Sequence, residues 1–195
     1  MQLMKKFING FFCHFIFRVR YKNLEVLKKY NQYLICPNHS NVFDPAFIYP
    51  KVDDLYFVAK KELFKHTLVA KFLRHYHAFP VDRQKVDVKS TMQSLSIFEN
   101  DKNAKLLIFP EGKVIKKKDD MGRIFKKGAV YISASTGIPI IPTFITFRPM
   151  AFSKVWVILG EPIFFDKSTI KNKEDLVNNS KKLIEDIYKL KKEVQ

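Results

Sequence analysis

The sequence predicts a single α/β domain with a mostly parallel or mixed central sheet flanked by helices, preceded by an N-terminal helical segment that contacts a membrane. Short apolar runs alternate with stretches of helical periodicity, which is typical of layered α/β folds. No Gly-, Ser- or Pro-rich linker interrupts the chain, and its 195 residues suit one domain. We therefore expect residues 1–17 to lie at a membrane interface and residues 18–195 to form one catalytic domain.

The N-terminal segment, residues 7–17, is mostly apolar and has basic residues on both sides. Its 11 residues are too few to span a bilayer, which needs about 20. No small-residue cleavage site follows it, so a secretory signal is not indicated. An apolar segment between basic flanks suits a lipid interface. The alternative is an ordinary helix packed on the domain core.

Six short apolar runs, each bounded by polar residues, Pro or Gly, predict strands. They cover residues 33–36, 56–59, 78–81, 105–109, 138–144 and 155–159.

Helices are predicted where apolar residues recur every three or four positions. They cover residues 62–76, 88–99, 126–136 and about 172–194. Gly137 is expected to end the third of these helices, because glycine readily adopts the left-handed conformation that follows a helix.

The composition points to an anionic partner. Lys and Arg total 35 and Asp and Glu total 19, a net charge of +16, which suits nucleic acid, an anionic membrane or a phosphorylated substrate. Residues 113–127 alone hold seven Lys or Arg, and form either a functional surface or a solvated loop. Cys13 and Cys36 give no disulfide framework, which fits a reducing compartment.

The first candidate for chemistry is Asn38-His39-Ser40-Asn41-Val42-Phe43-Asp44, directly after a predicted strand. In a regular helix His39 and Asp44 would be about 140° apart, so they meet only if residues 40–43 turn. Pro45 favours a helix that begins there with Asp44 as its N-cap. That cap is the structural explanation for Asp44. In the functional one, His39 is a general base that Asp44 orients, and the nucleophile belongs to the substrate.

Three further strand ends carry polar residues, and ligands bind at the carboxyl ends of strands in open α/β sheets. Glu111-Gly112 follows the fourth predicted strand and forms either a ligand contact or a plain turn. Arg83, one of six arginines, would bind a phosphate or pair with an acid. Lys60 stands at a helix entry, where charge is common.

Together these blocks resemble the lysophosphatidic acid acyltransferase family, the 1-acylglycerol-3-phosphate O-acyltransferases. The blocks NHSNVFD, VAKKEL, AFPVDR, FPEG and GIPIIPTFI occur in the family's order. The resemblance covers about residues 15–165 and implies a glycerol-3-phosphate acyltransferase-like fold.

The resemblance implies transfer of a fatty acyl group from acyl-CoA or acyl carrier protein to the free hydroxyl of 1-acylglycerol 3-phosphate, which gives phosphatidic acid. His39 would deprotonate that hydroxyl with support from Asp44. No cofactor, metal or acyl-enzyme is expected. The protein would be peripheral or monotopic on the cytoplasmic face of the cell membrane. Its partners would be the membrane surface, a lysophospholipid acceptor and the acyl donor, and it would not bind nucleic acid.

The substrate-binding residues also follow from the resemblance. Lys60 would supply an oxyanion donor, and Arg83 would hold the phosphate of the acceptor. Glu111 and Gly112 would shape the same pocket.

The sequence departs from the family pattern at three places. The usual Thr-Arg-Ser is replaced by Lys113-Val114-Ile115, and His77 stands where Gly is common. In the family a Ser is usually the second residue after the His, whereas here Ser40 is the first and Asn41 the second. These departures leave the base intact and bear on the acceptor headgroup, so acyl transfer to another lysolipid is an alternative. A non-catalytic basic membrane protein would not need His39. A nucleic-acid-binding module is disfavoured by the scarcity of Arg.

Overall fold

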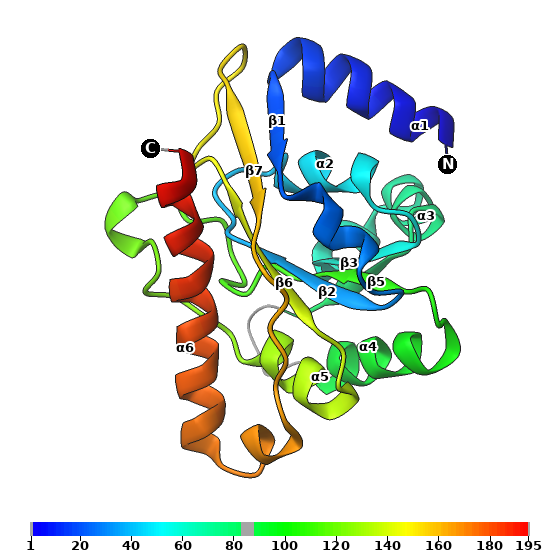
Figure 1. Ribbon diagram of the computed structural model, residues 1–195. Helices are drawn as coiled ribbons and strands as arrows, with labels where there is room; N and C mark the ends of the chain where they lie inside the picture. The colour runs from blue at the N-terminus through cyan, green and yellow to red at the C-terminus, as the bar shows by residue number, and fades with distance from the viewer. Residues whose placement is uncertain (1, 83–87, 195) are drawn as a thin grey trace.

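The computed structural model describes residues 2–82 and 88–194. In that part of the chain, seven strands form one mixed sheet in the order β1-β7-β6-β2-β5-β3-β4. All neighbours are parallel except β6 and β7 (Figure 1). The strands are β1 (Val19–Lys22), β2 (Tyr33–Pro37), β3 (Leu55–Lys60), β4 (Ala78–Val81), β5 (Lys105–Leu107), β6 (Ile140–Ile145) and β7 (Val155–Leu159).

Helices cover both faces of this sheet. The α-helices and the π-helix are α1 (Gln2–Phe7), the π-helix η1 (Ile8–Ile16), α2 (Asp44–Ile48), α3 (Thr67–His75), α4 (Val88–Asn100), α5 (Gly128–Thr136) and α6 (Lys173–Lys189). Short 3₁₀ segments are η2 (Leu24–Lys28), η3 (Tyr49–Lys51), η4 (Lys61–Lys65), η5 (Lys118–Asp120), η6 (Lys167–Ile170) and η7 (Leu190–Val194).

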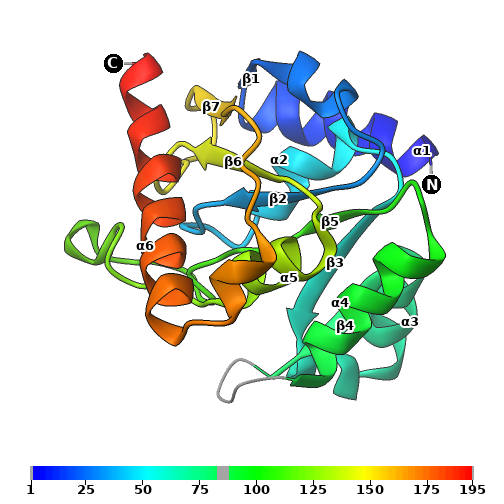
Figure 2. The same cartoon turned by 60° about the horizontal axis from the view of Figure 1, so that its bottom comes forward.

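The central strand β2 separates two apolar cores. Its side chains alternate between the faces, as strand geometry requires, so Ile35 enters one core and Leu34 the other. Residues of η1, η2 and α2 fill the first core, and residues of α4, α5 and α6 fill the second. Figure 2 shows α4, α5 and α6 on one side of the sheet, with α1 and α2 on the other. This confirms the predicted α/β fold class.

The predicted elements are confirmed with local corrections. β1 was not predicted, and the antiparallel strand β7 follows β6 through a loop of residues 146–154. The helix expected over 62–76 is divided into η4 and α3, since His66 between them has extended backbone. Gly137 ends α5 in the left-handed conformation (φ +74°), as predicted.

The N-terminal segment shows two different faces. Cys13 and Phe17 are buried, and Ile8, Phe12 and Ile16 pack beside them on the core. The opposite face exposes apolar side chains at four-residue spacing, namely Leu3, Phe7, Phe11 and Phe15. One side of the segment thus packs on the domain core, the other side is exposed, and its contact with a membrane stays a prediction. Within residues 2–82 and 88–194, no helix combines the length and apolarity needed to cross a bilayer.

Candidate active site

The backbone around His39 is held on three sides at the carboxyl end of β2. The Asn38 side chain donates from Nδ2 to the Ile145 carbonyl (3.0 Å) and accepts from the Ile145 N–H (2.7 Å), which ties it to β6. The His39 N–H donates to Oε2 of Glu111 (2.6 Å), and its carbonyl accepts from the Ile115 N–H (2.7 Å). His39 is thus fixed before any substrate arrives.

The His39 ring is paired with Asp44 as predicted. Nδ1 lies 3.0 Å from Oδ2 of Asp44, whose side chain is fully buried. The chain turns between them, with a hydrogen bond from the Asp44 N–H to the Asn41 carbonyl (3.2 Å). A carboxylate at Nδ1 favours the tautomer with its proton on Nδ1 and leaves Nε2 as the acceptor.

The expected N-cap role of Asp44 is wrong. Asp44 is the first residue of α2, and Phe43 occupies the cap position. The Oδ2 atom instead accepts from the backbone N–H groups of Ser40 (2.7 Å) and Asn41 (2.9 Å). Its carboxylate therefore faces back into the turn, because those two donors and the imidazole all converge on Oδ2. Desolvation of a carboxylate is costly, and three hydrogen bonds offset that cost.

One edge of the imidazole stays accessible. The ring stacks on Phe109, with centroids 4.0 Å apart and planes inclined by 25°. The His39 side chain is 6% exposed. Within the described residues, Nε2 of His39 has no hydrogen-bond partner. It is also not one of the unpaired side-chain atoms that are buried away from solvent. A hydroxyl brought to Nε2 would therefore meet a base with a free lone pair.

Glu111 is a buried support of this arrangement. Its Oε1 accepts from the Tyr188 hydroxyl on α6 (2.5 Å), while Oε2 accepts from the His39 N–H. Burial raises the pKa of Glu111 to about 7, against the lowering effect of those two hydrogen bonds, and the nearby Asp44 charge also raises it. Both oxygens are occupied by protein donors. We therefore assign Glu111 to positioning His39, and its predicted contact with substrate stays a prediction.

Sequence reasoning did not find Tyr188. Its only local signal is its place beside Ile187, whose side chain is fully buried in the helix-covered core. A Tyr at the border of a buried helix face usually finds a partner for its hydroxyl. The partner, however, is 77 residues away along the chain, so no local pattern identifies it.

Gly112 closes a tight turn after β5. Its N–H donates to the Phe109 carbonyl (2.9 Å), and its φ of +69° lies in the left-handed region. A Cβ here would also come within 2.9 Å of the Lys126 Cγ. Glycine thus suits this position because the turn needs a left-handed backbone and because the Lys126 side chain packs closely against it. The turn directs the Glu111 side chain into the protein.

Lys60 ends β3, two strands away from β2 in the same parallel part of the sheet. With strands about 4.8 Å apart, its backbone is roughly 10 Å from that of β2. Its side chain is about half exposed, and Nζ lies 3.8 Å from Oε2 of Glu62. No contact links it to His39 in the described structure, so its predicted oxyanion role stays a prediction.

Arg83 lies outside the described residues. The residue before it, Asp82, pairs with Lys61 at 2.5 Å. Over the described ranges, no group of three or more His, Cys, Asp or Glu side chains is placed to hold a metal ion. The burial of Cys36 raises the pKa of its thiol, so this cysteine is a poor nucleophile.

Comparison with protein families gives a match over the region that contains this site. The model of the family described as Acyltransferase matches residues 18–146, which is about two thirds of the chain. The chain belongs to the acyltransferase family. His39, Asp44, Glu111 and Gly112 all lie within the matched range.

Curated relatives carry the name 1-acyl-sn-glycerol-3-phosphate acyltransferase. The protein from Limnanthes douglasii is 28% identical over 142 residues, 67% of this chain and 48% of its own length. The Bacillus subtilis (strain 168) protein is 28% identical over 70% of this chain and 68% of its own length. The Streptococcus pneumoniae (strain ATCC BAA-255 / R6) protein is 27% identical over 73% and 53%. The chain thus spans about half to two thirds of the length of these relatives.

A solved structure shares the fold. The 1-acyl-sn-glycerophosphate (LPA) acyltransferase PlsC from Thermotoga maritima matches with a TM-score of 0.69 and 23% identity, over 96% of this chain and 79% of that one. At this identity the match supports the acyltransferase architecture.

Two departures from the family blocks have visible structural consequences. His77 adopts φ +60° and stacks on Tyr56, with centroids 4.8 Å apart. This conformation explains why glycine suits the position, since only glycine adopts it without strain. Ile115 is buried and its N–H binds the His39 carbonyl, so the residues that replace Thr-Arg-Ser still brace the base.

Proposed function

We propose that this acyltransferase moves a fatty acyl group from acyl-CoA or acyl carrier protein to the free hydroxyl of 1-acylglycerol 3-phosphate at a membrane surface. The observation that carries the proposal is the His39 Nδ1 to Asp44 Oδ2 contact of 3.0 Å, which leaves Nε2 free at the carboxyl end of β2. The names of the relatives support the choice of acceptor.

The reaction needs one base and no acyl-enzyme. Nε2 of His39 takes the proton of the acceptor hydroxyl while its oxygen attacks the thioester carbonyl carbon. The tetrahedral intermediate then collapses, the C–S bond breaks, and the departing sulfur takes the proton from the imidazolium. Asp44 stabilises that imidazolium. A positioned base accelerates such a step by about 10²–10⁴-fold.

The negative oxygen of the intermediate needs a donor, and Lys60 is our candidate. Its exposed side chain starts from the same sheet edge as His39. Loss of an oxyanion donor costs about 10²–10³-fold in kcat. We expect Lys60→Met to lower kcat by about that factor and to leave KM almost unchanged. A KM effect alone would assign Lys60 to substrate binding instead.

An apolar cavity of about 140 Å³ beside α2 suits part of an acyl chain. Its lining comes from the N-terminal helix, α2, η3, β3, α3 with the residue that follows it, and β5: Met4, Ile8, Pro45, Ala46, Tyr49, Leu55, Phe57, Phe72, Tyr76 and Leu107. Because Asp44 begins α2, the cavity opens within one helical turn of the catalytic pair. We expect Ala46→Phe to disfavour long-chain donors relative to short ones.

The acceptor would be drawn from a membrane on the cytoplasmic side. The exposed side chains of Leu3, Phe7, Phe11 and Phe15 support contact of the N-terminal helix with lipid. The phosphate of the acceptor would be held by Arg83. Exchange of Thr-Arg-Ser for Lys113-Val114-Ile115 favours, as a second candidate, the same transfer to another lysolipid.

Acyl transfer from a long-chain thioester to lysophosphatidic acid in mixed micelles tests the proposal. We expect His39→Ala to reduce turnover by at least about 10³-fold, whereas the exposed control His66→Ala keeps it. Normal turnover in the His39 variant would refute the base, whereas a wild-type protein without turnover would favour a non-catalytic protein. An acceptor panel with uncharged and zwitterionic lysolipids separates the two candidate acceptors.

A further inference from the structure

A row of exposed aromatic rings continues from the N-terminal helix onto the loop between β6 and β7. Phe7, Phe11 and Phe15 stack in succession, with ring centroids 5.4 and 5.7 Å apart. The edge of the row meets Phe152, whose ring is 6.5 Å from Phe15. Phe152 is 64% exposed and its loop neighbour Met150 is 73% exposed. Phe15 and Phe152, 137 residues apart in the sequence, thus belong to one apolar surface.

The loop is fastened to the helix by its backbone. The Phe152 N–H donates to the Ile16 carbonyl (2.5 Å), and Arg18 donates from Nη2 to the Phe152 carbonyl (2.7 Å). Phe152 has φ +62°, an uncommon conformation for a bulky residue, and these bonds hold it there. The ring is therefore presented outward on a fixed backbone.

The same loop holds the turn that carries His39 and Asp44. The Arg148 N–H donates to Oγ of Ser40 (2.8 Å), and Nδ2 of Asn41 donates to the Pro149 carbonyl (3.3 Å). One nine-residue segment thus contacts the apolar helix at Phe152 and the catalytic turn at Arg148 and Pro149.

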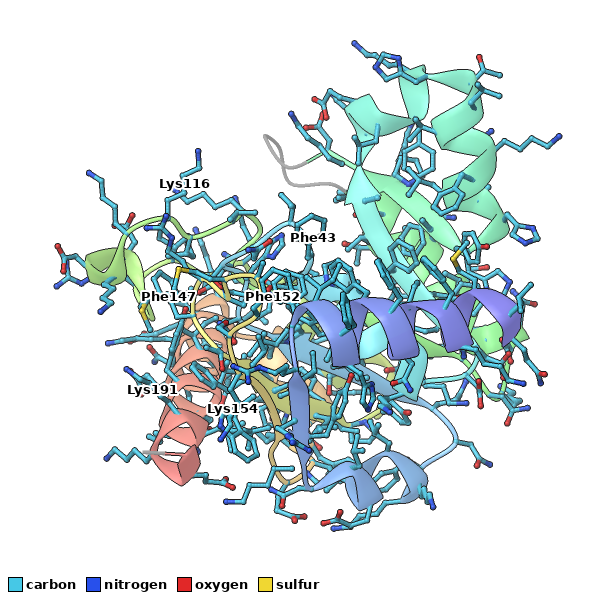
Figure 3. The ribbon with its side chains drawn as sticks, turned by 90° about the horizontal axis from the view of Figure 1, so that it is seen from above. Phe43, Lys116, Phe147, Phe152, Lys154 and Lys191 are labelled. Atoms are coloured by element: carbon cyan, nitrogen blue, oxygen red, sulfur yellow. The ribbon has the colours of Figure 1, made fainter. Side chains whose placement is uncertain are left out.

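The charge around this surface is positive. Residues 1–24 and 146–154 contain no Asp or Glu, whereas they include Arg18, Arg148 and Lys154. Figure 3 shows Phe43, Phe147 and Phe152 beside the end of the N-terminal helix, with Lys116, Lys154 and Lys191 around them. A protein partner with an apolar face would need its own acidic rim, whereas anionic phospholipid offers both apolar chains and negative headgroups. Each Lys or Arg near such a surface adds about 1 kcal/mol of attraction.

We infer that the loop of residues 146–154 is a second lipid-contacting element, which inserts Phe152 and Met150 into an anionic phospholipid bilayer beside the N-terminal helix. This inference rests on the proposed function, since it gives that enzyme its orientation at the membrane. Inserted this way, the loop sets the catalytic turn at the level of the lipid headgroups, where an acceptor hydroxyl is presented.

Vesicle binding tests the loop separately from the helix. The full chain carrying Phe152→Ser and Met150→Ser is compared with wild type by flotation on phosphatidylglycerol and on phosphatidylcholine vesicles. We expect its partition coefficient on phosphatidylglycerol to fall at least about tenfold, with weak binding of both proteins to phosphatidylcholine. Unchanged binding to phosphatidylglycerol would overturn the inference.

A matched control replaces one Phe and one Met of similar exposure elsewhere. Met92 on α4 is 60% exposed and Phe164, after β7, is 55% exposed. α4 lies at the far end of the molecule from the loop of residues 146–154 (Figure 1). Met92→Ser with Phe164→Ser should bind as wild type does. An equal loss of binding in this control would overturn the inference. The inference would also be overturned if the wild-type protein formed a dimer that the loop variant did not form, because the apolar surface would then bind a second copy of the chain.

Depth of insertion gives a measurement that does not depend on loss of binding. Phe152→Trp and Met92→Trp are each made in the Trp156→Phe background, so that each protein has a single Trp. Brominated lipids in phosphatidylglycerol vesicles should quench Trp at position 152 and leave Trp at position 92 unquenched. No quenching at position 152 would overturn the inference. Wild-type acyl transfer between monomeric short-chain substrates reports the proposed function without vesicles, so the two failures are distinguishable.

Discussion

The carboxyl ends of β2 and of β3 lie on the same edge of the sheet, yet they are built in different ways. At the end of β2, His39 and Asp44 are buried and joined by a 3.0 Å contact, with backbone donors on Asp44. Around β3, the ion pairs Lys60–Glu62 and Lys61–Asp82 are partly exposed to water. Exposed pairs contribute about 0–1 kcal/mol each, whereas breaking a buried one costs several. His39 is thus fixed by buried contacts, and the contact of Lys60 with substrate stays a prediction.

The largest effect on catalysis is expected from the variant that removes the negative charge of the buried Asp44. Asp44→Asn keeps an acceptor for the backbone donors but removes the negative charge that stabilises the His39 imidazolium. We expect kcat for acyl transfer to fall about 10³-fold while the circular dichroism spectrum is preserved. The control Asp186→Asn, which breaks the exposed Lys189 pair, should keep wild-type kcat. A loss below tenfold would show that His39 works without Asp44.

The buried carboxyl of Glu111 predicts a pH effect of known sign. Its pKa is about 7 in the folded protein against an ordinary value of 4.5, so between these values the folded state holds more protons than the unfolded one. The free energy of unfolding therefore falls as pH rises through this window, by about 3 kcal/mol. Glu111→Gln should remove this slope, as measured by urea unfolding at pH 5 and 8. An unchanged slope would mean that Glu111 is not its source.

Tyr188→Phe tests the same buried site through the hydrogen-bond partner of Glu111. Its hydroxyl donates to Glu111 and favours the ionised form, so its loss raises the pKa of Glu111 further. We expect a loss of about 2 kcal/mol in stability at pH 8 and about 1 kcal/mol at pH 5. Tyr30→Phe, at a half-buried tyrosine between η2 and β2, serves as control. Equal losses at the two pH values would show a packing effect only.

The smallest effect is expected at the exposed edge. Asp82→Asn removes the acid that pairs with Lys61, and we expect a change below about 1 kcal/mol in the free energy of unfolding. Urea unfolding at low and high salt checks this, because high salt screens the ion pair and should remove the difference in stability between the variant and the wild type. A loss above 2 kcal/mol would show that this end of the sheet is as closely tied as the end of β2.

The sequence predicts the frame of the fold because its strands are short apolar runs with clear boundaries. β1 was missed, since its pattern Val-Arg-Tyr-Lys is short and follows a far more apolar segment. Its Val19 is buried while Arg20 is exposed, an alternation that is visible only once a neighbouring strand is known. The direction of β7 also depends on pairing with β6 and not on its own residues.

The candidate site divides in the same way. The residues alone left two interpretations of Asp44 open, an N-cap or a partner of His39, and the resemblance to the family favoured the pairing that the structure shows. The direction of the Asp44 carboxylate was not, because it depends on the N–H groups of Ser40 and Asn41 in the folded turn. Glu111 was found by its motif, but its supporting role needs Tyr188, a contact between segments far apart in sequence.

Reversal of the chain between β6 and β7 has a consequence for how this enzyme adapts. A parallel continuation would require a crossover of a dozen or more residues. The antiparallel return needs only nine, and these nine are hydrogen-bonded to the catalytic turn and to the end of the N-terminal helix. Substitutions of the exposed Met150 and Phe152 would alter how apolar the surface is without shifting any strand register, whereas changes at Arg148 or Pro149 would reach the catalytic turn. If the inferred lipid contact holds, the two exposed side chains can change to suit a different bilayer while the backbone of the loop keeps the catalytic turn in place.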